Sequence, residues 1–175
     1  METRCKMTLA EFKEIGPYED PQYLTFNYEE TLFEHIRNQL LNYNETTYNS
    51  LTKGQKLLWG YITLSSQIRN GGITQYYWNY ESEYIDDMNL FLNVIKDQEF
   101  TNLLNESKEI YIKNKHLVSN YKHLDDQPNK LHNYYGLWAD IIKGDKLNKY
   151  FFANTEKIEK AIYNYVTKNP KEFIK

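Results

Sequence analysis

The sequence predicts an all-α fold, a compact single-domain helical bundle of about six to eight helices. Three observations support this prediction. Apolar residues recur at intervals of three and four along most of the chain, which is the period of a helix with one buried face. Capping residues precede several of these segments. No segment shows a convincing alternation of apolar and polar residues, so a β-sheet is not expected.

The chain of 175 residues is long enough to bury one hydrophobic core. Residues 1–26 are expected to form an N-terminal segment that is partly loop, because a Pro-Tyr-Glu-Asp-Pro run occupies residues 17–21. Residues 27–175 are then expected to form one all-α domain.

The first helix of this domain is expected to begin after Asn27, which forms a capping box with Glu30, and to run to about Leu41. Thr52 and Gln55 repeat the capping box before a second helix, which should end at a double glycine. The apolar residues of this second helix are spaced by three or four: Leu57, Tyr61, Leu64 and Ile68.

A short aromatic helix should follow, with an apolar stripe made of Ile73, Tyr76, Tyr77 and Tyr80. The next helix should open at Ser82, and another should follow Asp97 and end by about Lys115. Periodicity is weaker from there to Asp145, although Tyr134–Ile141 would make one more apolar face. A last helix is expected to begin with Asn154 as its N-cap and to be ended by Pro170.

The double glycine lies in the most informative stretch, from Gln67 to Asn79. A helix that ends at Asn70 would place Gly71 in the left-handed conformation, so we expect a positive φ at Gly71. Gln75 and Asn79 lie four residues apart and could hydrogen-bond across the corner. Buried amides that pin the corner are one interpretation, and a recognition or catalytic site is the other. The corner residues are Asn70, Gly71, Gly72, Gln75 and Asn79.

The motif Asn70-Gly71-Gly72-Ile73-x-Gln75-Tyr76-Tyr77-x-Asn79 resembles the signature of a bacterial domain family whose characterised member is an acidic DNA-mimic protein that sequesters a transcription factor. The similarity extends from about Ser50 to Lys175. Where the family usually has a glutamate and an asparagine, this chain has Gln67 and Arg69. The resemblance implies a non-enzymatic interaction domain whose carboxylates replace DNA phosphates on a transcriptional regulator.

Charge is distributed unevenly along the chain, although the net charge is only -3 and the pI is about 5.8. Glu11–Glu34 contains seven acidic residues and one lysine, and Glu81–Asp126 contains ten acidic residues and five lysines. Lys130–Lys175, by contrast, contains nine lysines and five acidic residues. An acidic face attracts a basic partner, and no compact basic patch supports direct nucleic-acid binding. The expected acidic binding surface consists of Glu81, Glu83, Asp86, Asp87, Asp97 and Glu99. The alternative is that these are solvated faces of amphipathic helices.

No catalytic residue, cofactor or metal site is expected. His116 and His123 are seven residues apart and could share a helix face, but the His-Glu-x-x-His spacing is absent. No apolar run approaches the roughly 20 residues of a membrane span, so no membrane partner is expected. The single cysteine, Cys5, fits a cytoplasmic location.

Three functions therefore remain open. The first is a DNA mimic that takes part in transcription regulation. The second is an immunity or antitoxin-like protein that blocks a toxin with one compact acidic patch. The third is an enzyme that uses the Asn-Gly-Gly corner. The partner is a DNA-binding protein in the first case and a toxin in the second, and a homodimer is left open. Trp78 lies off the apolar stripe and is expected to be exposed.

Overall fold

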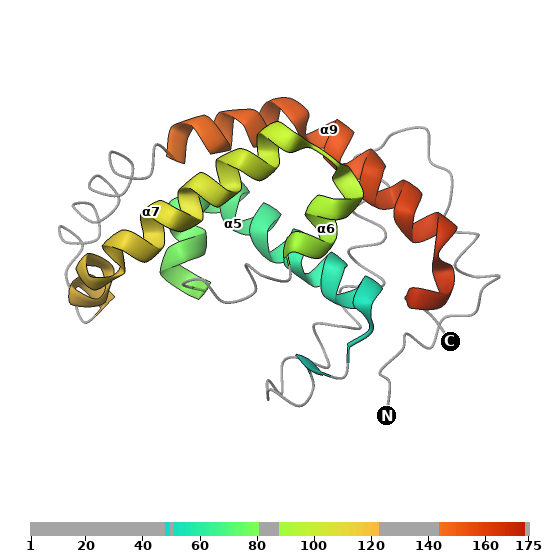
Figure 1. The fold of residues 1–175 in the computed structure, drawn as a ribbon, viewed down its shortest axis with the longest axis horizontal. Coiled ribbons are helices and arrows are strands. Elements are labelled where there is room, and N and C mark those ends of the chain that lie inside the picture. Colours follow the sequence, from blue (N-terminus) through green and yellow to red (C-terminus); the bar gives the residue numbers. More distant parts are fainter. Residues whose placement is uncertain (1–47, 50, 81–87, 123–143, 174–175) are drawn as a thin grey trace. The chain divides into compact units, whose positions relative to one another are not determined.

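A computed structural model of the chain describes residues 48–49, 51–80, 88–122 and 144–173 (Figure 1). The four α-helices of this part are α5 (Lys53–Tyr80), α6 (Met88–Ile95), α7 (Gln98–Lys122) and α9 (Gly144–Lys168), and the 3-10 turn η2 (Pro170–Glu172) follows α9. These described ranges contain no strand, which confirms the all-α class. The total of six to eight helices stays a prediction, because the helix expected after Asn27 and the face expected at Tyr134–Ile141 lie outside the described residues.

The described residues divide into two compact units. Unit 1 contains α5 up to Ile62, α6, and the residues from Thr155 through η2. Unit 2 contains α5 from Thr63 onward, α7, and α9 up to Asn154. Nowhere in the described part is a helix both long and apolar enough to cross a membrane.

In unit 1, the start of α5 holds the C-terminal tail of the chain. The predicted capping box is confirmed, because Thr52 N donates to Gln55 Oε1 (2.9 Å) and Gln55 N donates to Thr52 Oγ1 (3.2 Å). The same two side chains bind the tail: Thr52 Oγ1 donates to the carbonyl oxygen of Glu172, and Gln55 Nε2 donates to that of Phe173 (3.4 Å). We call these four residues the C-terminal clasp.

The core of unit 1 contains Leu57 and Tyr61 of the predicted apolar stripe of α5, and its other buried residues include Met88, Leu92, Ile95, Ile158, Ile162 and Val166. Tyr61 meets Phe91 edge to face, with ring centroids 6.1 Å apart. The Tyr61 hydroxyl donates to Glu159 Oε1 (3.1 Å), so this buried carboxylate has a hydrogen-bond donor.

Helix α9 ends at Lys168, two residues before Pro170, as predicted. Its predicted start at Asn154 is wrong, since the helix begins at Gly144. The Asn154 side chain donates to the carbonyl oxygen of Tyr150 (2.9 Å), as a polar residue inside a helix can do. The turns before Asn154 are helical because Leu147 and Phe151 continue the buried face of α9 at helical spacing.

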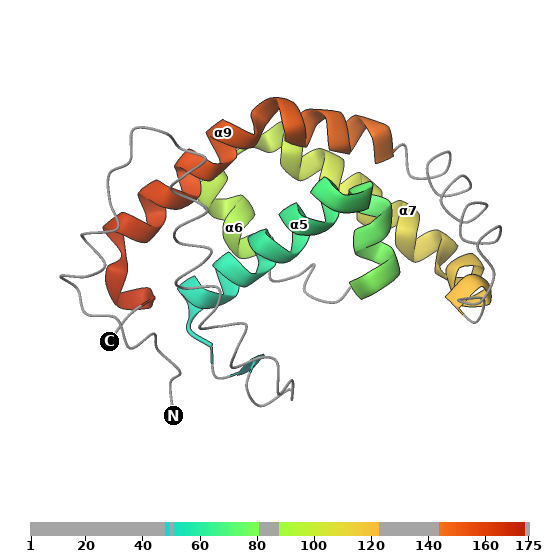
Figure 2. The same ribbon diagram turned by 180° about the vertical axis from the view of Figure 1, so that it is seen from behind.

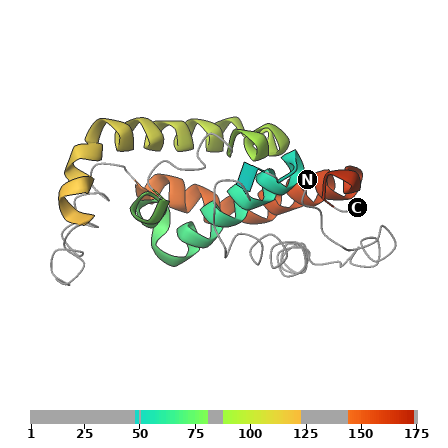
Figure 3. The same cartoon turned by 90° about the horizontal axis from the view of Figure 1, so that it is seen from below.

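In unit 2, Asp97 caps α7, because Phe100 N donates to Asp97 Oδ1 (3.0 Å) and Thr101 N donates to the Asp97 carbonyl oxygen (2.9 Å). Of the residues whose helical spacing predicts the face of α7, Phe100, Leu103, Leu104, Ser107 and Tyr111 are buried, and Ile110 is half-buried. The helix continues to Lys122, as Figure 3 shows in yellow and gold, so the predicted end near Lys115 is wrong. No glycine or proline occurs between Lys115 and Lys122 to end the helix earlier.

Candidate functional site at the bend of α5

Helix α5 changes direction sharply at the double glycine (Figure 2), which separates a first arm, residues 53–70, from a second arm, residues 73–80. Gly71 has φ -154° and ψ 18°, and Gly72 has φ 78° and ψ -179°. The φ and ψ angles of Gly72 are essentially restricted to glycine, because a Cβ atom would clash with the backbone. The prediction of a positive φ at Gly71 is therefore wrong by one residue, and Gly72 is the glycine that the bend requires.

Asn148 of α9 caps the second arm of α5. Its Oδ1 accepts a hydrogen bond from Ile73 N (3.0 Å), one of the donors that a helix N-terminus leaves without an intrahelical partner. The Asn148 amide lies so close to Gly72 that a Cβ atom added there would collide with Asn148 Nδ2. Sequence reasoning missed Asn148, because it lies 75 residues from Ile73 and no local pattern connects them.

Three amide side chains meet across the bend, and we call Gln67, Gln75 and Asn79 the amide cluster. Gln67 Oε1 accepts from Gln75 Nε2 (2.9 Å) and from Asn79 Nδ2 (2.6 Å), which confirms the predicted hydrogen bonding across the corner. The cluster is not buried, however. Asn79 is exposed and the two glutamines are half-buried. The interpretation of buried amides is therefore wrong, because the aromatic stripe of the second arm occupies the buried face.

Asn70 and Gly71 are also exposed, whereas Gly72 is buried against Asn148. The bend thus has two parts. Gly72 is buried and the half-buried Asn148 packs against it, whereas Asn70, Gly71 and the amide cluster face solvent to different degrees.

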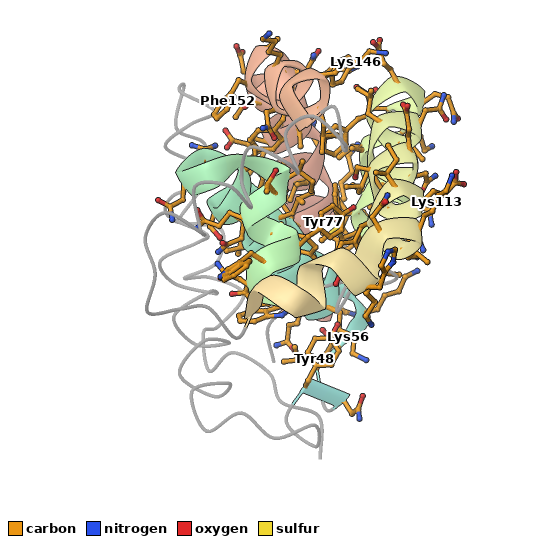
Figure 4. All side chains as sticks on the ribbon, turned by 90° about the vertical axis from the view of Figure 1, so that its left-hand side faces the viewer. Tyr48, Lys56, Tyr77, Lys113, Lys146 and Phe152 are labelled. Carbon is orange, nitrogen blue, oxygen red and sulfur yellow. The ribbon has the colours of Figure 1, made fainter. Side chains whose placement is uncertain are left out.

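Tyr77 fills the interior of unit 2 between α5 and α7 (Figure 4). Its ring stacks on Tyr111 with centroids 4.5 Å apart, and its hydroxyl lies 2.8 Å from Ser107 Oγ. Because Ser107 donates its one hydroxyl proton to the Leu104 carbonyl oxygen (2.8 Å), Tyr77 is the donor. Burial raises the pKa of Tyr77 far above its ordinary value, so the hydroxyl stays protonated.

The assignment of Tyr76 and Tyr77 to the interior is confirmed, since both are fully buried. Trp78, expected to be exposed, is half-buried. Of the aromatic residues of the second arm, Tyr76 and Tyr77 therefore belong to the core, and Trp78 and Tyr80 are half-buried.

Four residues of the predicted acidic surface, Glu81, Glu83, Asp86 and Asp87, lie outside the described residues. Asp97 is only 4% exposed, and its carboxylate accepts hydrogen bonds from Phe100 N and from the Tyr150 hydroxyl. The assignment of Asp97 to a binding surface is therefore wrong, because helix capping holds its carboxylate inside unit 2.

Glu99 is exposed on α7, as predicted. Glu106 and Glu109 are exposed on the same helix, seven and ten residues further on, so helical periodicity places them on the side of α7 that carries Glu99. The acidic surface predicted from the sequence did not include Glu106 and Glu109, although their helical spacing from Glu99 is visible in the sequence. We call Glu99, Glu106 and Glu109 the α7 acidic stripe.

We expect Tyr150→Phe to lower the free energy of unfolding by about 1 to 2 kcal/mol at neutral pH, because the phenol donates to both oxygens of Asp97 (2.9 and 3.1 Å). Partial burial and this hydrogen bond to the Asp97 carboxylate raise the pKa of Tyr150 to about 12. A folded-state pKa above the unfolded value of about 10 means that the stabilisation is complete below pH 10 and is lost as the pH rises to about 12.

The measurement is urea unfolding of both proteins from pH 8 to 12, followed by circular dichroism. The other tyrosines titrate equally in the two proteins, so their contribution cancels in the difference. A stability difference that stays constant to pH 12 would show that the phenol proton does not hold Asp97.

Within the described ranges, no group of three His, Cys, Asp or Glu side chains is placed to hold a metal ion. His116 is exposed on α7, while His123 and Cys5 lie outside the described residues.

Comparison with known proteins gave one result. A family model described as DMP19-like protein matches residues 49–169, a range that includes the whole bend, the α7 acidic stripe and Asn148. No curated protein and no solved structure matches the chain.

Proposed function

The chain belongs to the DMP19-like protein family, and we propose that it acts as a DNA mimic that occupies the DNA-binding surface of a transcriptional regulator. Family membership over residues 49–169 is the observation that carries this proposal. In this function the chain is not an enzyme, and its partner is a basic protein of the cytoplasm. Carboxylates on the mimic would take the place of phosphates and release the counterions of the partner, as DNA does.

The α7 acidic stripe supports the proposal with exposed carboxylates on one helix. Glu99 and Glu109 are ten residues apart, which corresponds to about 15 Å along a helix. A DNA duplex carries one negative charge per roughly 1.7 Å, so three glutamates over this length are too sparse to imitate it alone. The proposed surface must therefore also include Glu81, Glu83, Asp86 and Asp87, which precede α6 in sequence.

The bend side of α5 is not expected to be part of this acidic surface. Residues 48–80 contain no aspartate or glutamate, but they contain Lys53, Lys56 and Arg69. A DNA-like potential must come from other segments, because a mimic works through its local field rather than through its net charge of -3.

We expect duplex DNA to displace the partner from the full-length protein. The immobilised chain is incubated with an extract of its native cells at low salt, and bound proteins are eluted with a short DNA duplex and identified by mass spectrometry. The eluted partner should be a DNA-binding protein, and its association should weaken steeply as salt is raised.

The variant Asp86→Asn with Asp87→Asn removes two charges at nearly constant size and is expected to reduce capture of that partner. Glu156→Gln, an exposed acid on α9, is the control and should capture it normally. A captured partner that resists both excess duplex and high salt would contradict DNA mimicry. A captured toxin without nuclease activity would instead support the immunity function.

A further inference from the structure

We propose that the amide cluster at the bend of α5 is a recognition site for an arginine side chain of the protein partner. The inference rests on the proposed function for its class of partner, since DNA-binding proteins present arginines on the surface that meets DNA. The observation that supports the proposal is that Gln75 and Asn79 both donate to Gln67, close in sequence to the exposed end of the first arm.

Gly71 supports a role beyond the fold. Its φ of -154° lies outside the left-handed region that favours glycine, and the residue is exposed, so the positive φ of the bend falls on Gly72 and not on Gly71. A Cβ atom at Gly71 would instead collide with Gln75 Oε1. The missing side chain therefore leaves room for the Gln75 carboxamide to lie over the backbone of the bend.

Hydrogen bonds between solvent-accessible side chains contribute little to folding, because water replaces them in the unfolded chain. Gly72 provides the backbone conformation of the bend, and Asn148 caps its second arm. The amide cluster and the space at Gly71 thus form an ordered polar surface that stability does not account for, whereas preorganised polar groups are what a recognition site needs.

The hydrogen bonds of the cluster also fix which atoms remain for a partner. Gln75 and Asn79 both turn their nitrogens to Gln67 Oε1, so the opposite ends of both amides, Gln75 Oε1 and Asn79 Oδ1, are acceptors. Two acceptors on side chains that share one hydrogen-bond partner suit a donor with several N–H groups. Arginine has five donors in a rigid planar arrangement, which distinguishes it from lysine.

The end of the first arm adds a negative potential. A helix that stops leaves its last carbonyl groups without intrahelical donors and carries a partial negative charge at that end. Asn70 and Gly71 are exposed at this end, and Ile73 N at the adjoining helix start is already bound by Asn148. The carbonyl end of the first arm therefore offers acceptors to a donor, whereas the exposed Arg69 next to it in sequence carries a positive charge that opposes a bound cation.

The experiment uses the full-length protein with N-acetyl-arginine amide as the probe. Side-chain amide resonances are followed by nuclear magnetic resonance during titration at millimolar concentrations. We expect saturable shifts at Gln75 and Asn79. The amides of Gln98 and Asn102, which form an exposed hydrogen-bonded pair on α7 (2.8 Å), are the internal control and should not shift. N-acetyl-citrulline amide, which keeps the shape but not the charge, should bind at least several-fold more weakly.

Variants test each part of the proposal. Asn79→Ala and Gln75→Ala should each weaken probe binding by roughly tenfold while the melting temperature stays within a few degrees. Asn102→Ala is the matched control and should leave binding unchanged. Gln67→Glu keeps the acceptor, adds a charge and should tighten binding several-fold, and Arg69→Gln should also tighten it by removing a nearby cation.

Equal shifts at Asn79 and Asn102, no saturation, or unchanged binding in Asn79→Ala would each overturn the proposal. Looser binding in Gln67→Glu would also overturn it, because the glutamate can only accept hydrogen bonds and must hold the amides in the orientation described. These outcomes test the arginine site alone. The proposal of DNA mimicry is tested by the other experiment, and it is contradicted if duplex DNA does not displace the natural partner.

Discussion

Replacement of Phe173 with alanine is expected to lower the free energy of unfolding by about 3 to 5 kcal/mol, the largest effect of any substitution considered. The ring is completely buried and meets Tyr165 edge to face, with centroids 6.4 Å apart. It also packs on the start of α5, where a Cβ atom added to Gly54 would lie 2.7 Å from Phe173 Cζ. Domains of this size are stable by about 5 to 15 kcal/mol, so the variant should lose a large share of its stability.

Phe152→Ala is the matched control, because Phe152 is 55% exposed on α9 and is seen at the surface in Figure 4. This variant should unfold within about 0.5 kcal/mol of the unchanged protein. Both are measured by urea unfolding with circular dichroism. If the two variants proved equally stable, the tail would not be part of the folded core of unit 1.

Gly72→Ala is expected to cost about 2 to 4 kcal/mol. Part of this is the strain of forcing a residue with a Cβ atom into φ 78° and ψ -179°, about 1 to 3 kcal/mol. The rest is the loss of the cap, because the new methyl group displaces the Asn148 side chain from Ile73 N, at about 1 kcal/mol.

Gly71→Ala is the control at the adjacent residue, and it should cost less than about 1 kcal/mol, since its φ is not in the left-handed region and the Gln75 side chain can rotate away from the new methyl group. Asn148→Ala alone should cost about 1 kcal/mol. Combined with Gly72→Ala it should add almost nothing, because the cap is already lost. Equal destabilisation by the two glycine variants would contradict the backbone geometry of the bend.

Features encoded by neighbouring residues could be predicted from the sequence. The capping box of Thr52 and Gln55 depends on two side chains three residues apart, and the structure contains both of its hydrogen bonds. The buried faces of α5 and α7 were likewise predictable, because a 3.6-residue period is visible in a single segment. The hydrogen bonds of Gln75 and Asn79 followed from the same kind of local reasoning.

Features that depend on distant residues could not be predicted. Asn148 caps the second arm of α5 although it lies 75 residues from Ile73. Nothing in the sequence near Asp97 indicates that the Tyr150 hydroxyl of α9 donates a hydrogen bond to its carboxylate. The choice between Gly71 and Gly72 for the positive φ also depends on tertiary packing, since both residues can adopt it. Asn154 was mistaken for a helix start because an asparagine can cap a helix or lie inside one.

The C-terminal clasp has a consequence for the order in which the chain folds during synthesis. The hydrogen bonds from Thr52 to Glu172 and from Gln55 to Phe173 span 120 and 118 residues, so the start of α5 cannot make them until residues 172 and 173 have been synthesised. Closing a loop of this length is slow because its entropy is lost before the contacts form. Unit 2 draws all its described residues from positions 63–154 and can complete its core earlier. A ribosome-bound chain that lacks the tail should therefore present a protected α7 and a protease-sensitive beginning of α5.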